Sequence, residues 1–246
     1  MRTVVVSFLL FVLVTGFVYG KSVRIRYEGA SGLEYSLKRS ERVHREYWNG
    51  KEQNFRYSME KRLLEKVEKL EDGSLRRKVK QLQGKMKYLD EVEAVASKQP
   101  SHEERINALG EELANVPGAE GANPGRMRLV FPEEPVTVGS TWSYTAPASH
   151  TFPAPLKTKF RLVSFKEFRG HDCAYIKAST KYMGRHEDRN VDASLKSRGR
   201  IYFDIEKGVI ISSVSSTRFS LRYLEDMKNS RPRLERRVID IKYSLK

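Results

Sequence analysis

Alternation of apolar and polar side chains runs through the second half of this chain and limits what the chain can fold into. In "LKTKFRL" (156–162) and "ASLKSRGRIYFDI" (193–205), one set of alternate side chains is uncharged and mostly apolar, whereas the other carries most of the charge. Successive side chains of a strand point to opposite faces of a sheet, so this period of two predicts strands with one buried face. We therefore expect antiparallel β-structure over about 141–246, with short turns at 169–172 and 206–208.

The first half of the chain is less uniform. "SVRIRYE" (22–28) and "LEYSLKRS" (33–40) alternate in the same way, and the Asn-Gly pair at 49–50 favours a tight hairpin turn. Between 51 and 83 many apolar residues recur at spacings of three and four, which suit two helices joined at "EDGS" (71–74). The Asp-Gly pair in that turn suits a long β-hairpin equally well, so periodicity leaves both structures open.

Helix signals concentrate in "PSHEERINALGEELANVPG" (100–118). Ser101 can cap a helix there, and two glutamates follow in the first turn, where the helix dipole favours acidic side chains. Together with the helical pattern of 88–98, these signals predict a helical insert at about 86–117. The sequence "PGAEGANPG" predicts a Pro/Gly-rich linker at 117–125.

Residues 1–20 predict a secretory signal peptide. Arg2 precedes an uncharged, apolar run from Val4 to Tyr19, which is shorter than the ~20 residues that span a bilayer. Small residues precede Lys21, where we expect cleavage. The product would be a secreted or periplasmic protein consisting of a single domain, 21–246. Retention of the run as a membrane anchor is the alternative.

The charge and the cysteine content limit the partners and the source of stability. The chain has 46 Lys and Arg against 31 Asp and Glu, a formal net charge of +15. Such an excess suits an anionic membrane surface or an acidic polymer, but the basic residues are interleaved with acidic ones along the chain, which favours a plain solvated surface. Export argues against nucleic acid as a partner. Cys173 is the only cysteine, so no internal disulfide is available and the core alone must stabilise the fold.

Neither a catalytic nor a metal-binding pattern stands out, and we expect no cofactor. The sequence has no nucleophile elbow, no phosphate-binding glycine loop and no zinc-protease motif. In "GHDC" (170–173), adjacent residues of a strand point to alternate sides, so they cannot converge on one ion; we expect a turn that leads into a strand with a buried cysteine. His186 has acidic neighbours in "GRHEDRN" (184–190), which we interpret as a solvated loop.

Apolar side chains on the predicted inner side of the sheet are the candidates for ligand binding. They belong to "TWSYT" (141–145) and to the two alternating stretches described first. An ordinary packed core and a ligand cavity would both use such a set, because a gap in side-chain packing cannot be seen in a sequence. The candidate ligand-binding residues are Trp142, Tyr144, Phe160, Leu162, Ile201, Phe203 and Ile205.

Four stretches resemble motifs of one group of proteins. "FPEEPVTVGSTW" (131–142) resembles the pattern "PxxPVxVGDxW", with Ser140 where the pattern has an acidic residue. "GHDCAYI" (170–176) and "GRIYFDIEKGVI" (199–210) match its later motifs, and "KVEKLEDGSLRRKV" (66–79) matches its acidic-Gly hairpin. The chain thereby resembles exported bacterial envelope proteins of unknown function, and through them the lipoprotein-carrier (Lol-like) class. Many of those proteins carry a lipobox cysteine that this chain lacks.

The resemblance implies a mainly β (α+β) fold: a curved antiparallel sheet or half-open barrel, partly wrapped round one or two helices. It also favours the β-hairpin over the helical hairpin for 51–83. We expect, on the same basis, a non-enzymatic, secreted cell-envelope protein that binds a lipid or the acyl chain of a lipoprotein. The leading alternative is an envelope interaction or scaffold protein with a filled β core. A hydrolase that uses a histidine paired with an acid, around His186, is the third hypothesis.

Overall fold

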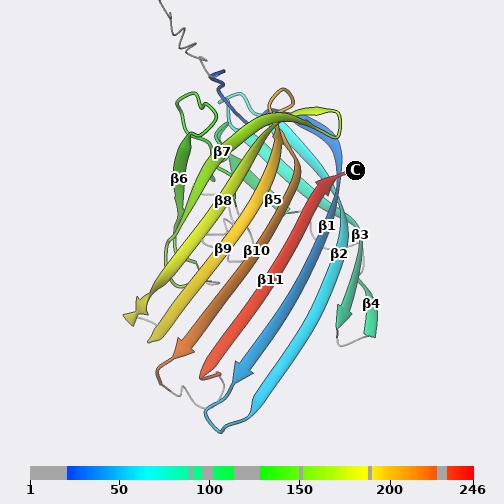
Figure 1. Ribbon diagram of the computed structural model, residues 1–246. Coiled ribbons are helices and arrows are strands. Elements are labelled where there is room, and N and C mark those ends of the chain that lie inside the picture. Colours follow the sequence, from blue (N-terminus) through cyan, green and yellow to red (C-terminus); the bar gives the residue numbers. More distant parts are fainter. Residues whose placement is uncertain are drawn as a thin grey trace, which may run out of the picture.

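The alternating segments form long strands that lie side by side in one antiparallel sheet of 11 strands (Figure 1). The computed structural model describes residues 21–88, 91–95, 102–113, 128–149, 152–187, 190–225 and 232–246. The strands are β1 (Ala30–Glu46), β2 (Glu52–Lys69), β3 (Leu75–Tyr88), β4 (Glu91–Val95), β5 (His102–Ile106), β6 (Thr141–Ala146), β7 (Leu156–Phe168), β8 (His171–His186), β9 (Val191–Asp204), β10 (Val209–Tyr223) and β11 (Leu234–Leu245). Their order across the sheet is β4-β3-β2-β1-β11-β10-β9-β8-β7-β6, and β5 also pairs with β3. Among the described residues the end strands β4 and β6 do not pair, so the sheet is open.

The first and last strands meet in the middle of this sheet. β1 pairs with β11 from Tyr35↔Leu245 to Glu46↔Leu234, and the two lie side by side in blue and red in Figure 1. β11 therefore joins an N-terminal half, β1 to β5, to a C-terminal half, β6 to β10. The antiparallel structure expected over about 141–246 is confirmed. Its hairpin turn at 206–208 is found as well, with Gly208 at a positive φ of 64°.

The helical insert expected at about 86–117 is wrong wherever the structure describes those residues. β3 continues to Tyr88, and both β4 and β5 pair with β3. The described residues contain no α-helix, so no helix wraps the sheet there. Among these residues there is accordingly no helix long and apolar enough to cross a membrane. The predicted linker at 117–125 and the predicted signal peptide at 1–20 lie outside the described residues.

Contacts between strands explain why the helix signals failed. Glu104 of β5 accepts a hydrogen bond of 2.5 Å from Arg77 of β3, and Ile106 packs with Val67 and Leu75. Glu104 and Ile106 are two residues apart and both are buried, as a strand requires. A capping serine and acidic first turn are local preferences of about 1 kcal/mol each, and the contacts with a neighbouring strand outweigh them.

The segment 51–83 is the β-hairpin rather than a pair of helices. β2 and β3 pair over most of their lengths, and the turn between them closes with the Leu70 amide donating to the Ser74 carbonyl at 2.8 Å. Gly73 has a positive φ of 79° in this turn, which a glycine adopts without steric cost. The spacing of four keeps Met59, Leu63 and Val67 on one face of β2, as a strand requires. The spacing of three before Leu82 in β3 falls at the register shift between the two strands.

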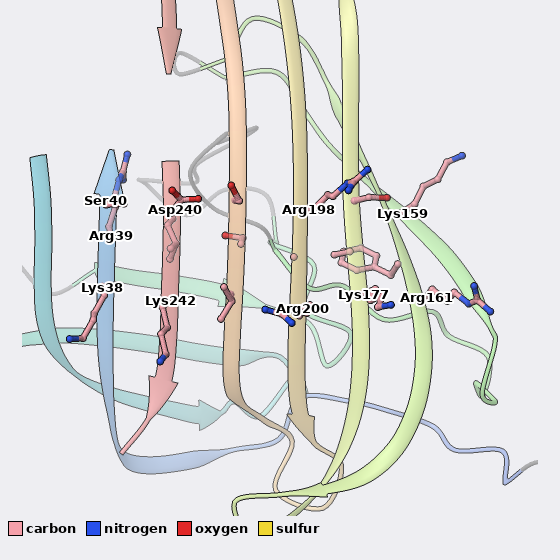
Figure 2. Close-up of a pocket in the computed structure, with 18 of the residues that line it drawn as sticks. Lys38, Arg39, Ser40, Lys159, Arg161, Lys177, Arg198, Arg200, Asp240 and Lys242 are labelled. Carbon is pink, nitrogen blue, oxygen red and sulfur yellow. The ribbon is translucent and has the colours of Figure 1, made fainter. Parts of the chain in front are cut away.

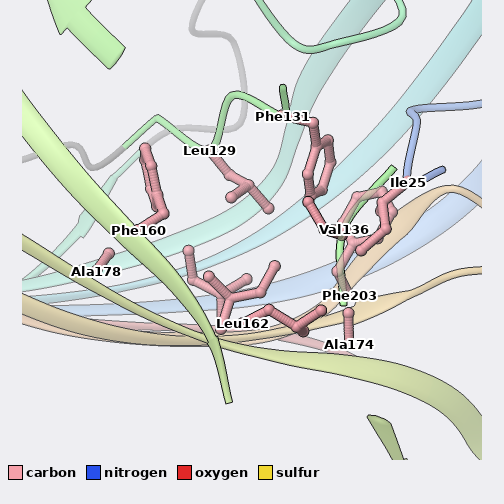
Figure 3. Packing of buried hydrophobic residues seen from close by; sticks show 11 residues of the cluster. Ile25, Leu129, Phe131, Val136, Phe160, Leu162, Ala174, Ala178 and Phe203 are labelled. Carbon is pink, nitrogen blue, oxygen red and sulfur yellow. The ribbon is translucent and has the colours of Figure 1, made fainter. Parts of the chain in front are cut away.

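The two faces of the sheet differ in character. The outer face carries exposed lysines and arginines in its middle, including Lys177, Arg200 and Lys242 (Figure 2). The inner face carries most of the buried clusters. Its main cluster packs side chains of β7, β8 and β9 against two covering segments, 21–28 and 128–136 (Figure 3). That cluster contains Ile25, Leu129, Phe131, Val136, Phe160, Leu162, Ala174, Ile176, Ala178, Ile201 and Phe203.

The segment 131–142 forms the corner that holds the covering chain to the sheet. Val136 bridges to Val23, so the two covering segments pair with each other. Gly139 turns the chain with a positive φ of 95°, and β6 then begins. The Trp142 indole N–H donates to the Val130 carbonyl at 2.6 Å, and its ring stacks on Phe160 with centroids 5.6 Å apart. One large aromatic side chain thus ties the corner to the edge of the sheet.

Candidate functional site

A cavity of about 410 Å³ lies on the inner face, where the two halves of the sheet meet. A row of residues that are paired across β2, β1, β11, β10 and β9 runs beneath it. Ser215 and Gly199 have small side chains or none, so this part of the sheet does not fill the space above it. In register order the row consists of Met59, Arg39, Ile241, Ser215 and Gly199.

Apolar side chains form most of the wall. They come from both halves and from the covering segments, and Tyr27 closes one side with its hydroxyl donating to the Leu129 carbonyl at 3.2 Å. The volume falls within the ~300–1,000 Å³ typical of small-molecule sites. The apolar wall residues include Leu37, Leu63, Val67, Val79, Ile106, Leu129, Ile201 and Ile241.

A buried ion network lines the cavity on its β3 side. Arg77 binds Glu65 through two hydrogen bonds, Nε to Oε1 at 2.8 Å and Nη2 to Oε2 at 2.7 Å. Its Nη1 also lies 2.5 Å from Oε1 of Glu104, which Arg128 contacts at 2.9 Å. The hydroxyl of Tyr243 donates to Glu65 at 2.7 Å. Each side chain of this network therefore has a partner within the protein, as burial requires.

The protonation states of this network follow from its surroundings. Burial by itself would raise the pKa of Glu65, but the charge and hydrogen bonds of Arg77 outweigh burial, and the pKa is lowered. Burial and the nearby Glu65 raise the pKa of Tyr243 well above its ordinary value. Glu65 is thus ionised and Tyr243 protonated near neutral pH, which keeps the donor and acceptor roles fixed.

A second ion network lies at the Arg39 end of the cavity. Glu41 is 1% exposed and accepts hydrogen bonds from Arg39 at 2.6 Å, from Arg237 at 3.2 Å and from the Tyr57 hydroxyl. Burial and the bond to Glu41 raise the pKa of Tyr57 to about 12. The Nε of Arg39 is buried and has no hydrogen-bond partner among the described residues. A buried donor without a partner costs free energy, so this N–H is available to donate a hydrogen bond to a ligand oxygen.

The two networks carry opposite excess charge. Three arginines meet two glutamates at the Arg39 end, an excess of one cation, and two arginines meet three glutamates at the Arg77 end, an excess of one carboxylate. The first network consists of Arg39, Arg45, Arg237, Glu41 and Glu235; the second consists of Arg77, Arg128, Glu65, Glu104 and Glu112. The cavity is therefore electrically asymmetric along its length.

The seven residues predicted from sequence come together, but mainly in the packed cluster rather than around the cavity. Phe160, Leu162, Ile201 and Phe203 are buried members of the main cluster, and Trp142, Tyr144 and Ile205 pack against it. The covering segments fill the space above them (Figure 3). Of the seven residues, Ile201 alone lines the inner cavity.

The wall contributed by β1, β2 and β3 was missed by the sequence reasoning. Leu37, Met59 and Leu63 line the cavity. The charged residues that line it are Arg39 of the first network and Arg77, Arg128, Glu65 and Glu104 of the second. Charged residues at alternate positions of a strand are usually interpreted as a solvated face. In addition, the sequence left both a helical hairpin and a β-hairpin possible for 51–83, so its inner side was undefined. Once the hairpin is assumed, the alternation of Met59, Leu63 and Val67 with outward charges would have pointed to an inner wall.

The remaining chemically reactive side chains form no site among the described residues. His171 Nδ1 pairs with Asp204 at 2.8 Å, whereas Cys173 is buried beside Val209 and Ile211, and burial raises its pKa to about 11. His186 ends β8, and its Nδ1 has no hydrogen-bond partner in the part of the chain that the structure describes. In that part no three His, Cys, Asp or Glu side chains are grouped as metal ligands.

No family model and no curated protein matches this chain. The solved structures that are similar to it include the following three. A lipovitellin structure, described under the words "lipid-protein interactions in lipovitellin", shares 12% identity at a TM-score of 0.48. The match covers 89% of this chain and 25% of that chain. DynF from the dynemicin biosynthesis pathway of Micromonospora chersina shares 6% identity at a TM-score of 0.25, covering 92% and 86%. A LolA-superfamily protein from Nitrosomonas europaea shares 11% identity at 0.19, covering 87% and 86%.

The chain spans a quarter of the lipovitellin chain that it matches. TM-scores and identities this low establish neither a family nor a ligand for this chain.

Proposed function

We propose that this protein is a non-enzymatic binding protein that holds the hydrocarbon chain of a lipid or lipoprotein in its inner cavity. The observation that carries the proposal is the cavity of about 410 Å³ with its apolar wall, set where the two halves of the sheet meet. Transfer of a hydrocarbon chain from water into such a wall contributes ~0.8 kcal/mol per methylene.

The charge asymmetry sets the direction of the ligand. The Arg39 end has one excess cation and the unpartnered Nε, and the side chain of Arg39 is 28% exposed, so a head group there stays in reach of water. The Arg77 end is buried, has an excess carboxylate and would repel an anion. An anionic head group therefore lies at Arg39, with its chain running along Met59 and Leu63.

The location belongs to the same proposal. Residues 1–20 have the composition of a signal peptide, and the proposed mature protein, 21–246, is secreted or periplasmic. A lipid-binding protein in that compartment would carry a molecule that is poorly soluble in water between envelope surfaces.

An interaction or scaffold protein is the second candidate. Six of the seven predicted ligand residues lie in the packed cluster, away from the cavity wall, and β6 is a short edge strand with one side unpaired among the described residues. An exposed edge strand can accept a strand from another protein.

The test is lipid extraction followed by a matched pair of variants. Protein isolated gently from its own cells is extracted and analysed by mass spectrometry, and uptake of a fluorescent fatty acid is then measured. Met59→Trp fills the cavity and should weaken uptake by about tenfold or more, whereas Met183→Trp, at a side chain 89% exposed, should leave uptake unchanged. No co-purified lipid together with equal uptake by both variants would reject the carrier and favour the interaction protein.

A third variant tests the direction of the ligand. Arg39→Met should weaken binding of a fatty acid and leave binding of the matching fatty alcohol almost unchanged, because only the acid needs the guanidinium. Equal losses for both ligands would place the head group elsewhere.

A further inference from the structure

A second and larger hollow lies on the opposite face of the same strands. It has a volume of about 1310 Å³ and crosses β6 to β11, β1 and β2 (Figure 2). Nearly every strand contributes consecutive residues to it, such as Lys38, Arg39 and Ser40 of β1. The Arg39 side chain lies on the inner face, so the flanking Lys38 and Ser40 side chains point outward. We call this hollow the outer groove.

Cationic side chains lie in register along the outer groove. Arg161 pairs with Lys177, Lys177 with Arg200, and Lys242 with Lys38. Only Val214 interrupts this row, between Arg200 and Lys242. Strands lie ~4.8 Å apart, so the row of six positions spans five steps, about 24 Å. It presents close to one positive charge per strand along a line perpendicular to the strands.

A second row runs beside the first, about 6.8 Å away, because residues two apart on a strand share a face. It mixes cations with hydroxyls, and Asp240 is its one acidic member. In register order it consists of Lys159, Ser179, Arg198, Ser216, Asp240 and Ser40. The groove thus offers hydrogen-bonding hydroxyls next to a line of fixed positive charges.

The positive charge of the outer groove is largely uncompensated. Eight Lys and Arg side chains line its outer side against two acidic ones, Glu60 and Asp240, an excess of six. In the described part of the chain, the ion pairs include one of those eight, Lys38 with Glu60 at 2.7 Å. The eight are Lys38, Lys157, Lys159, Arg161, Lys177, Arg198, Arg200 and Lys242.

Like charges that face each other across paired strands destabilise a sheet. Lys177 opposite Arg200 and Lys38 opposite Lys242 are such pairs, and neither is needed to cover the inner core, which is on the other face. A bound polyanion would turn this repulsion into attraction and release its own counterions.

From these observations we propose that the outer groove binds an acidic polysaccharide, extended across the strands with its carboxylates on the Arg161-to-Lys38 row. One strand step is close to the length of one sugar ring in a polymer, so one cation per strand matches one carboxylate per sugar. The serine hydroxyls of the second row can bond to the sugar hydroxyls.

Two other anionic partners fit the outer groove less well. The aromatic residues among its lining positions, Trp142 and Phe160, have their rings in the inner cluster, so the described residues offer no platform on which bases could stack. Val214 is the one outward apolar side chain in the groove, which leaves little to insert into a membrane. A hollow also matches a chain better than it matches a flat bilayer surface.

The proposal does not depend on the inner cavity, because the two hollows lie on opposite faces. The test measures binding of polygalacturonate to the whole protein and to two double variants with the same loss of charge. Lys177→Ser with Arg200→Ser removes one pair from the outer groove. Lys181→Ser with Lys196→Ser removes an exposed pair from the same two strands, outside the groove.

The expected result is a loss of affinity of about tenfold or more for the groove variant and a much smaller loss for the control. Uptake of the fluorescent fatty acid should be the same in both variants, which separates this site from the cavity. Equal losses in the two variants would reduce the effect to net charge and overturn the proposal. Tighter binding of polyphosphate, of single-stranded DNA or of vesicles of equal parts phosphatidylcholine and phosphatidylglycerol, at the same salt, would also overturn it.

Discussion

The two halves of the inner face bury different kinds of side chain, and different interactions stabilise them. In the C-terminal half, the inner positions hold apolar side chains such as Phe160, Leu162 and Phe203, each at most 1% exposed. In the N-terminal half, Glu41 and Glu65 occupy inner positions and are almost as deeply buried, at 1% and 6% exposed. One half therefore relies on apolar packing, whereas the other relies on carboxylates that are matched to arginines.

This difference explains where the cavity lies. Apolar side chains have no preferred partner and can move together until space is filled. Paired arginines and glutamates must keep their hydrogen-bond geometry, so the N-terminal half cannot close onto the apolar half without leaving charges unpaired. A gap where the two halves of the sheet meet costs less free energy than a broken buried ion pair. The cavity is found at that place.

The largest effect is expected from removing the central cation of the charged half. Arg77→Ala leaves Glu65 and Glu104 buried without their main partner and should lower the free energy of unfolding by about 3–5 kcal/mol. Arg76→Ala is the matched control, because Arg76 points outward and pairs with the half-exposed Glu103. This substitution should lower the free energy of unfolding by only about 0.2–1 kcal/mol. Urea denaturation measures both. Similar losses for the two variants would show that the buried network has no special weight.

A smaller difference should separate the packed half from the cavity wall. Leu162→Ala creates a new void at a fully buried position and should cost about 3 kcal/mol, within the range for such truncations. Leu63→Ala enlarges a space that already exists, so it should cost about 1–2 kcal/mol. Both values come from unfolding curves of ligand-free protein. A larger cost for Leu63 would mean that the cavity is filled by protein in solution.

The charged half should also make stability depend on pH. The pKa of Glu65 is lowered in the folded protein from its ordinary 4.5, so the unfolded chain binds this proton more readily. Its contribution is therefore present above about pH 4.5 and is lost as the pH falls through the lower folded pKa. Urea denaturation between neutral pH and about pH 3 should show this loss, with a flatter profile in Glu65→Gln. Parallel profiles would assign the acid sensitivity to other carboxylates.

The smallest expected effect concerns Cys173 in the apolar, C-terminal half, whose thiol should not react with a labelling reagent in the native protein. Cys173 is 1% exposed and its pKa is raised to about 11 by burial, so at pH 8 it is almost wholly a protonated thiol shielded from water. A thiol reagent should label it only after denaturant is added. Rapid labelling of the native protein would show that the packed half opens to solvent.

The C-terminal half was readable from sequence because each strand pairs with its neighbour in the chain. The alternation in 193–205 and the turn at Gly208 are local signals, and the structure follows them. The helix signals near Ser101 were misleading because β5 forms through contacts with β3. Glu104 of β5, for example, pairs with Arg77 of β3, which lies 27 residues earlier in the chain. Local capping preferences say nothing about such a partner.

The candidate site was less accessible to sequence reasoning than the fold. A glutamate or arginine at an alternating position looks solvated unless its counter-ion is known, and the partners here lie far apart in the chain, as with Glu65 and Tyr243. The outer groove also depends on register. Neither Lys177 nor Arg200 is unusual alone, and only pairing across β8 and β9 makes them neighbours.

The central place of β11 has a consequence for the order of events during synthesis. A chain made from its N-terminus produces β1 and β10 before β11, and until β11 arrives each of these strands has one edge open to water. Tyr35 and Leu245 must then meet across almost the whole chain, a slow kind of contact to form. β11 also brings Ile241 to the cavity floor and Tyr243 to Glu65. The cavity is thus absent from every shorter nascent chain, and the ability to hold a ligand appears in one step, when the last strand is added.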